Sequence, residues 1–122
     1  MNIVLWLLQV VLAVVFAGLG GLKLIRSKEE LLPKLPALGP YRPISIKAIA
    51  LAEVLGALGL VVAPLVGWAA LVPWAALGVG SVMVAGAMAH AELGDWKPIG
   101  LNVALLIAAV VVMVGRSAHL PL

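Results

Sequence analysis

Residues 48–63 read AIALAEVLGALGLVVA, and Glu53 is the one charged side chain in this run. A run this apolar predicts a helix that crosses a lipid bilayer, which needs about 20 mainly apolar residues. An ionised glutamate near the middle of such a helix costs roughly 2.5–3.5 kcal/mol on insertion scales. Residues of this kind usually face the protein interior and carry function, so Glu53 is the first candidate for a functional site.

The composition of the whole chain indicates the same class of protein. Of its 122 residues, 65% are hydrophobic and only 11% are charged, whereas soluble domains have about 45–50% apolar and about 25% charged residues. Backbone groups inside lipid must be hydrogen-bonded within the segment, which favours helices. We therefore predict one integral membrane domain over residues 1–122, an all-α bundle of four spans near residues 3–25, 44–63, 68–91 and 98–115.

The links between the spans predict a short helix and the orientation of the chain in the membrane. Ser27 and Glu30 have the spacing of a capping box, which predicts a short helix over residues 28–35 in the first link. Basic residues gather at the first and third links, which the positive-inside rule places in the cytoplasm with both termini outside. Arg116 and His119 are expected at the outer interface. The basic residues at the two links are Lys23, Arg26, Lys28, Lys34, Arg42, Lys47 and Lys97.

Small residues at four-residue spacing predict which helix faces pack together, because helices in lipid associate by close backbone approach. Glu53 lies one turn before the first of these residues in its own span, so its side chain is expected to face protein. The predicted packing residues are Ala17, Gly21, Gly56, Gly59, Gly80 and Gly86.

Four polar residues, one from each span, are predicted to lie in the cytoplasmic half of the bundle: Lys23, Glu53, His90 and Asn102. Together they form a candidate ligand pocket around Glu53. Three of them have a plainer interpretation: Lys23 as a snorkelling lysine, His90 as an interfacial histidine and Asn102 as an asparagine that bonds a neighbouring helix. We assign no catalytic residue, because no nucleophile triad, phosphate loop or zinc helix is present. No metal site is expected, since the two histidines fall on opposite sides of the membrane and cysteine is absent.

Several short motifs together resemble the DoxX-like family of small four-span membrane proteins. These are GLGGLKL at residues 18–24, EVLGALGL at 53–60, MVAGAMAH at 83–90, and Asn102 with Arg116 in the last span. The family takes its name from a membrane component of a thiosulfate:quinone oxidoreductase. Other bacterial relatives are linked to oxidative-stress complexes, and distant animal relatives are assembly chaperones for ligand-gated channels. The resemblance implies a common scaffold in a bacterial inner membrane and leaves the reaction open.

Three functions fit these residues. The first is a non-catalytic membrane module or chaperone-like partner, which associates with itself as a homodimer or with another membrane protein and holds a small lipid-like ligand near Glu53. The second is a quinone-binding subunit of an oxidoreductase, with quinone as the cofactor. The third is a small dimeric transporter. Nucleic acid is not an expected partner, because the positive charges flank membrane spans.

Overall fold

The computed structural model describes residues 2–118, and within them all regular secondary structure is helical, with no strand. Its four long helices are each long and apolar enough to cross a membrane. The prediction of an all-α bundle with four spans is therefore confirmed, while His119 lies outside the described residues. The long helices are α1 (Asn2–Ile25), α3 (Pro43–Leu65), α4 (Val72–Glu92) and α5 (Lys97–Ala118), and the short ones are α2 (Lys28–Leu31), η1 (Pro36–Leu38) and η2 (Ala69–Leu71).

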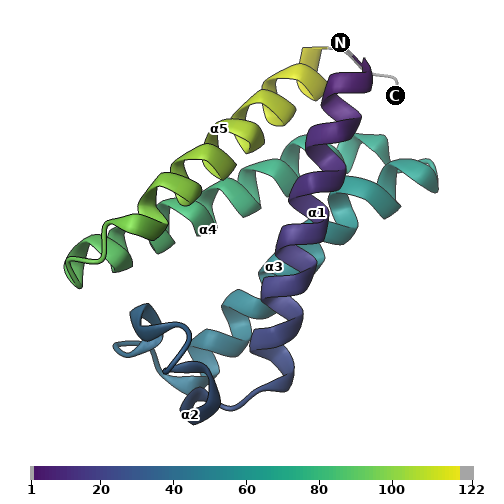
Figure 1. Cartoon of the computed structure of the whole chain (residues 1–122). Coiled ribbons are helices and arrows are strands. Elements are labelled where there is room, and N and C mark those ends of the chain that lie inside the picture. The colour runs from purple at the N-terminus through teal and green to yellow at the C-terminus, as the bar shows by residue number, and fades with distance from the viewer. Residues whose placement is uncertain (1, 119–122) are drawn as a thin grey trace.

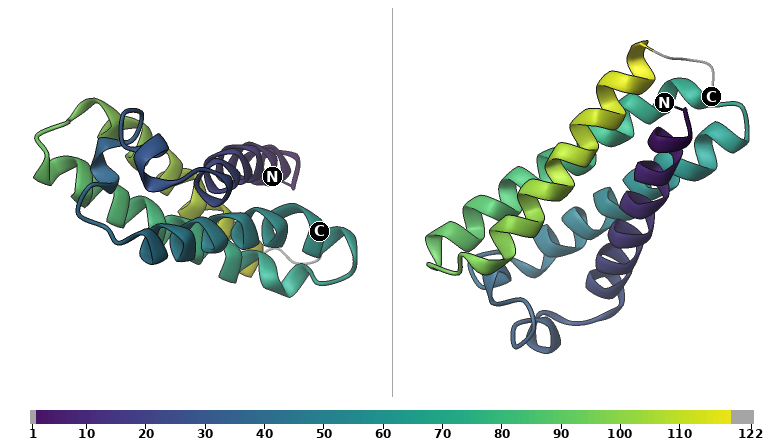
Figure 2. Two further views of the ribbon diagram at one scale, coloured as in Figure 1. Left: turned by 90° about the horizontal axis from the view of Figure 1, so that it is seen from below. Right: turned by 45° about the horizontal axis from the view of Figure 1, so that its top comes forward.

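The long helices form two antiparallel pairs, α1 with α3 and α4 with α5, which contact each other through α3–α4 and α1–α5 (Figure 1). The pairs converge where α1 begins and α5 ends, which we call the terminal end. They splay apart at the opposite end, where residues 26–42 and 93–96 connect the helices, which we call the link end (Figures 1 and 2).

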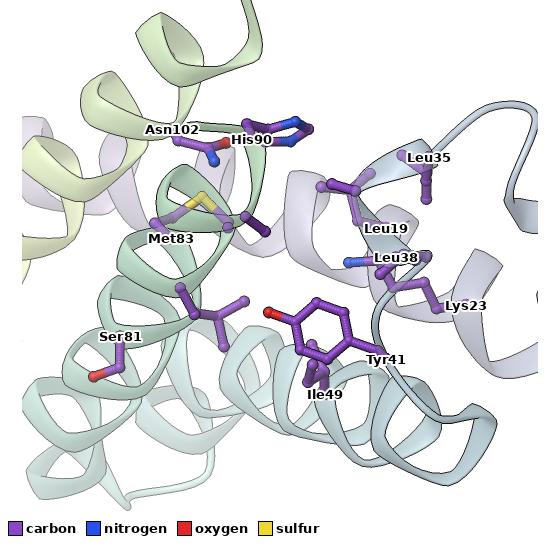
Figure 3. Close-up of a pocket in the computed structure, with 15 residues that line it drawn as sticks. Leu19, Lys23, Leu35, Leu38, Tyr41, Ile49, Ser81, Met83, His90 and Asn102 are labelled. Atoms are coloured by element: carbon purple, nitrogen blue, oxygen red, sulfur yellow. The ribbon is translucent and has the colours of Figure 1, made fainter. Parts of the chain in front are cut away.

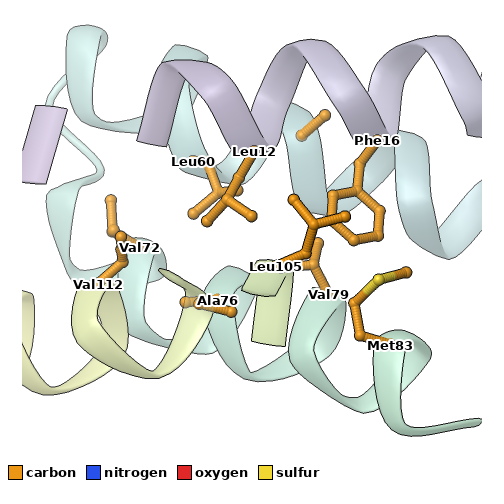
Figure 4. Close-up of a cluster of buried hydrophobic side chains, with 11 residues drawn as sticks. Leu12, Phe16, Leu60, Val72, Ala76, Val79, Met83, Leu105 and Val112 are labelled. Carbon is orange, nitrogen blue, oxygen red and sulfur yellow. The ribbon is translucent and has the colours of Figure 1, made fainter. Parts of the chain in front are cut away.

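A core of buried apolar side chains fills the space between the pairs towards the terminal end (Figure 4). Every long helix contributes to it, so the core fixes the relative positions of all four spans. Close packing of this kind is what holds helices together in lipid, where no hydrophobic driving force acts between them. The core residues are Leu12, Phe16, Ala57, Leu60, Val72, Ala76, Val79, Met83, Leu105, Ala109 and Val112.

Glycines set the closest approaches between helices. A Cβ atom at Gly56 would lie 2.5 Å from a methyl carbon of Val79, and one at Gly59 would lie 2.7 Å from the Ala75 Cβ, so α3 and α4 pack through both positions. Gly80 packs less closely on α5, because a Cβ atom there would lie 3.6 Å from the Ala109 Cβ.

The packing face of α1 differs from the one predicted. Ala17 is exposed, and a Cβ atom at Gly21 would meet nothing within 4 Å. The contact is made by Gly20, where a Cβ atom would lie 2.8 Å from the carbonyl oxygen of Ala50. Phe16, one turn earlier, is fully buried on the same face. The span carries small residues on more than one face, and their four-residue spacing alone does not tell which face packs.

The first link folds back over the link end of the bundle. The Ser27 hydroxyl accepts a hydrogen bond from the backbone N–H of Glu30, as a capping box requires, but α2 ends at Leu31 and not at residue 35. Pro33 explains the early end, because it has no N–H to donate to the preceding turn. The ammonium group of Lys28 then donates to the carbonyl oxygens of Gly39 and Tyr41, which ties the link into a closed loop.

A second lysine attaches this loop to the bundle. Lys47, in the second turn of α3, donates to the carbonyl oxygens of Lys23, Leu24 and Arg26 at the end of α1. The last carbonyl groups of a helix have no partner within the helix, so this ammonium group satisfies them and holds the start of the link against α3.

Candidate functional site

A buried ion pair joins the two helices of the first pair. The ammonium nitrogen of Lys23, in the last turn of α1, lies 2.5 Å from Oε1 of Glu53, near the middle of α3. The side chain of Glu53 is completely buried and that of Lys23 is 12% exposed. Gly20 makes the contact possible, because a Cβ atom there would lie 3.0 Å from the Cβ of Glu53. The second carboxylate oxygen, Oε2, is buried and has no hydrogen-bond partner among residues 2–118.

Next to this pair lies a cavity of about 310 Å³ between the helix pairs at the link end (Figure 3). Most of its wall is apolar, and the first link contributes part of it. In Figure 3 the hydroxyl group of Tyr41 and the side chain of Lys23 enter from one side, and Asn102 and His90 lie on the other. The residues that line it are Leu19, Lys23, Leu35, Ala37, Leu38, Tyr41, Ile49, Ser81, Val82, Met83, Ala85, Gly86, Ala89, His90 and Asn102.

Asn102 and His90 form the polar wall on the second helix pair. Asn102 fits against α4 because Gly86 has no side chain, and a Cβ atom there would lie 3.0 Å from the amide nitrogen of Asn102. His90 Nδ1 lies 3.7 Å from a carboxylate oxygen of Asp95, which is too long for a hydrogen bond. Within the described part of the chain this buried nitrogen has no other partner, so a ligand in the cavity can supply one.

The structure brings the four predicted pocket residues to the same end of the bundle but arranges them differently from the prediction. Lys23, His90 and Asn102 line the cavity, whereas Glu53 does not. Glu53 lies behind Lys23, because the long lysine side chain reaches back from the end of α1 to the middle of α3. The pocket therefore presents the lysine ammonium group, with the glutamate as the counter-ion that holds it in place.

Tyr41 is a wall residue that the sequence did not reveal. Its position between Pro40 and Pro43 indicated only an extended link near the membrane surface. The link covers the cavity because Leu31 and Leu38 pack on Ile46 of α3, and this cluster carries Tyr41 with it. The apolar spacing within the link was the available signal, and it was equally compatible with a segment lying on the membrane.

A second polar cluster lies at the terminal end. Arg116, predicted at the outer interface, is completely buried. Its Nε donates to Oε1 of Gln9 and its Nη1 to Oδ1 of Asn2, each at 2.6 Å, so α5 is bonded to α1. Gln9 donates in turn to the carbonyl oxygen of Leu60 in α3, also at 2.6 Å. A glutamine inside an apolar run was the sequence signal for this network.

Metal ligands do not gather at either end. Among residues 2–118, no group of three or more histidine, cysteine, aspartate or glutamate side chains is placed to hold a metal ion. The polar groups at the cavity are the ammonium of Lys23, the amide of Asn102, the imidazole of His90 and the hydroxyl of Tyr41, and these suit hydrogen bonding to an organic molecule.

Four apolar helices, a buried lysine–glutamate pair and a largely apolar cavity at one end define a small multi-pass membrane protein with an internal cavity. The family model for the DoxX-like family matches residues 7–112, and the chain belongs to the DoxX-like family. This confirms the resemblance inferred from the sequence motifs. No curated protein and no solved structure gives a significant match to the chain.

Proposed function

We propose that this DoxX-like protein is a non-catalytic membrane module that holds a small amphipathic molecule in the cavity at the link end. The observation that carries the proposal is the cavity itself, an apolar space of about 310 Å³ with polar groups of both helix pairs on its wall. Ligand sites are typically mainly apolar clefts of about 300–1,000 Å³ with a few fixed polar groups. A volume at the lower limit suits a polar head and a short part of its tail.

The polar groups favour a ligand whose head accepts hydrogen bonds. An ammonium group has three donors, and the Lys23 ammonium gives one of them to Glu53. Asn102 and Tyr41 add an amide and a hydroxyl donor. Carbonyl, carboxylate and phosphate oxygens therefore match the wall better than an amine does. Because Glu53 neutralises Lys23, the ligand need not carry a charge.

Quinone binding is the second candidate, and one feature favours it. The donors stand on opposite sides of the cavity, Lys23 and Tyr41 on one and Asn102 on the other (Figure 3). A quinone has two carbonyl oxygens at opposite edges of its ring, so both can be bonded at once while an apolar tail follows the cavity wall. In this case the chain supplies the binding site, and the electrons come from another subunit.

The orientation and the partner remain proposals as well. We propose that the protein lies in a bacterial inner membrane with the link end in the cytoplasm, which the basic residues at that end support. A reporter active only in the cytoplasm, fused to the C-terminus, should be inactive, and activity would reverse the orientation. A homodimer or another membrane protein as partner stays a prediction, and chemical cross-linking in intact membranes tests it.

Ligand-dependent thermal unfolding of the purified protein tests the binding function. The panel contains a short-chain quinone, its quinol, a fatty acid and a lysophospholipid. A ligand that binds should raise the melting temperature, and Ala89→Leu, which fills part of the cavity, should abolish the rise. Ala104→Leu is the matched control, because Ala104 is exposed and lies outside the cavity. Equal ligand effects in the two variants would exclude the cavity as the site.

A further inference from the structure

Arg116 is a buried cation for which residues 2–118 provide no anion. Its guanidinium group bonds the neutral side chains of Gln9 and Asn2, and Nη2 is buried without a hydrogen-bond partner among residues 2–118. The five acidic residues of the chain are Glu29, Glu30, Glu53, Glu92 and Asp95. Four of them belong to the first and third links or to the end of α4 beside the third link, and Glu53 is bonded to Lys23. A buried arginine normally has a paired charge, so an external anion is the expected partner.

The depth of Arg116 identifies where this anion comes from. Arg116 is in the last turn of α5, a helix of 22 residues that is about 33 Å long. Asn2, its partner, begins α1 at the same end. The hydrocarbon core of a bilayer is about 30 Å thick and its headgroup regions lie just beyond, so the guanidinium group is at the level of lipid headgroups. Phospholipids place a phosphate anion at that depth.

The surroundings are those of a lipid site. The Arg116 guanidinium carbon lies 5.6 Å from the centre of the Trp6 ring, and tryptophan side chains favour the headgroup level of a membrane. Large apolar side chains below this level are exposed on both helices, such as Leu7 on α1 and Val110 and Val114 on α5. An acyl chain attached to a phosphate at Arg116 can follow these side chains towards the membrane centre.

We propose that Arg116 binds the phosphate group of an anionic phospholipid at the terminal end of the bundle. The bonds to Gln9 and Asn2 fix the plane of the guanidinium group, and Nη2 is the donor that remains for a phosphate oxygen. Asn2 is exposed and Trp6 is half-buried, so the Arg116 guanidinium group lies directly beneath residues at the protein surface. Arginine–phosphate bonds are short and charge-assisted, and Nη2 can donate such a bond to one phosphate oxygen.

Native mass spectrometry of the purified protein tests the proposal. The protein is mixed with equal amounts of a phosphatidylglycerol and a diacylglycerol that carries the same acyl chains but no phosphate. The wild type should retain the phosphatidylglycerol in preference. Arg116→Gln should reduce its retention about tenfold, the effect of losing one good charge-assisted contact. Two controls should retain it: Lys97→Gln, which removes an exposed cation from the other end of α5, and Ala89→Leu, which fills the cavity.

Each other result refutes the proposal. Equal retention of the two lipids by the wild type would show that phosphate is not recognised, and this comparison holds even if Arg116→Gln does not fold. Loss of retention in Lys97→Gln to the same degree would indicate a general charge effect. Loss in Ala89→Leu would place the lipid in the cavity. Complete displacement of the lipid by an equal concentration of inorganic phosphate would identify a free anion as the ligand.

Discussion

Replacing Lys23 by methionine should destabilise the protein far more than the loss of one exposed lysine would. Glu53 would keep a fully buried carboxylate with neither oxygen paired, whereas Lys23 itself is 12% exposed and can be replaced without leaving a void. Removing one partner of a buried ion pair typically costs about 3–5 kcal/mol. Because the lysine already meets the cavity, we expect the lower end of that range, about 3 kcal/mol in the free energy of unfolding.

The converse substitution should cost less. In Glu53→Gln the amide can still accept a hydrogen bond from Lys23, and the lysine ammonium group can turn into the cavity, so we expect a loss of about 1–2 kcal/mol. In the double variant neither position carries a charge, so the loss in free energy of unfolding should be well below the sum of the two single losses. The expected coupling energy is about 2 kcal/mol, within the range found for residues in direct contact.

The assay is reversible unfolding in mixed detergent micelles, in which the fraction of a denaturing detergent is raised and helix content is followed by circular dichroism. The matched control is the exposed pair Arg26–Glu30, whose side chains are 52% and 53% exposed. Screening by water should make its double-variant cycle additive. A coupling energy below about 0.5 kcal/mol for Lys23 and Glu53 would refute the reasoning, because distant and independent sites show values that small.

Three further predictions concern the helix packing, the attachment of the first link and the charges within it. Gly20→Val should cost about 1–3 kcal/mol of stability, because the new Cβ would collide with the backbone of α3. Gly21→Ala is the control: its Cβ points into open space, so it should be neutral or slightly stabilising in the same assay. Lys47→Met should lower the free energy of unfolding by about 1–3 kcal/mol, since the last carbonyl groups of α1 lose their donor. Amide hydrogen exchange should accelerate at the end of α1 but not in α5. The hydrogen bond from Arg26 and those from Ser27 lower the pKa of the Glu30 carboxyl. The small stabilising effect of this carboxylate should therefore be present above the ordinary carboxyl pKa and be lost as the pH falls through the lowered value. Arg26→Ala should raise the pKa of Glu30 in an NMR titration, and an unchanged pKa would contradict the contact.

The four spans were predictable because lipid imposes a length and a composition that each segment must meet by itself. The 24 residues of α1 and the 23 of α3 satisfy this locally, without reference to any other part of the chain. The face that each helix turns inwards is not a local property. In α1 the buried face is set by the contact of Gly20 with α3, and Ala17 offered an equally good pattern on another face.

Some members of the site were predictable, but its geometry was not. Lys23, His90 and Asn102 were expected together from their depth along the helices, and they share one cavity. The place of Glu53 behind Lys23 depends on how far a flexible side chain reaches, which depth alone does not tell. Tyr41 joined the wall only because the first link folds back, a result of long-range contacts between the link and α3.

The two polar clusters, at opposite ends of the bundle, each contain a buried cation, but only the one at the link end has a counter-ion among the described residues. At the link end the chain provides both charges, so the Lys23–Glu53 pair is neutral and the adjacent cavity can receive a molecule without a net charge. At the terminal end the described residues provide only the cation, and fully buried side chains such as Leu12 and Leu60 lie between Arg116 and the cavity. A ligand at one end therefore cannot neutralise the charge at the other, and the two ends require separate partners.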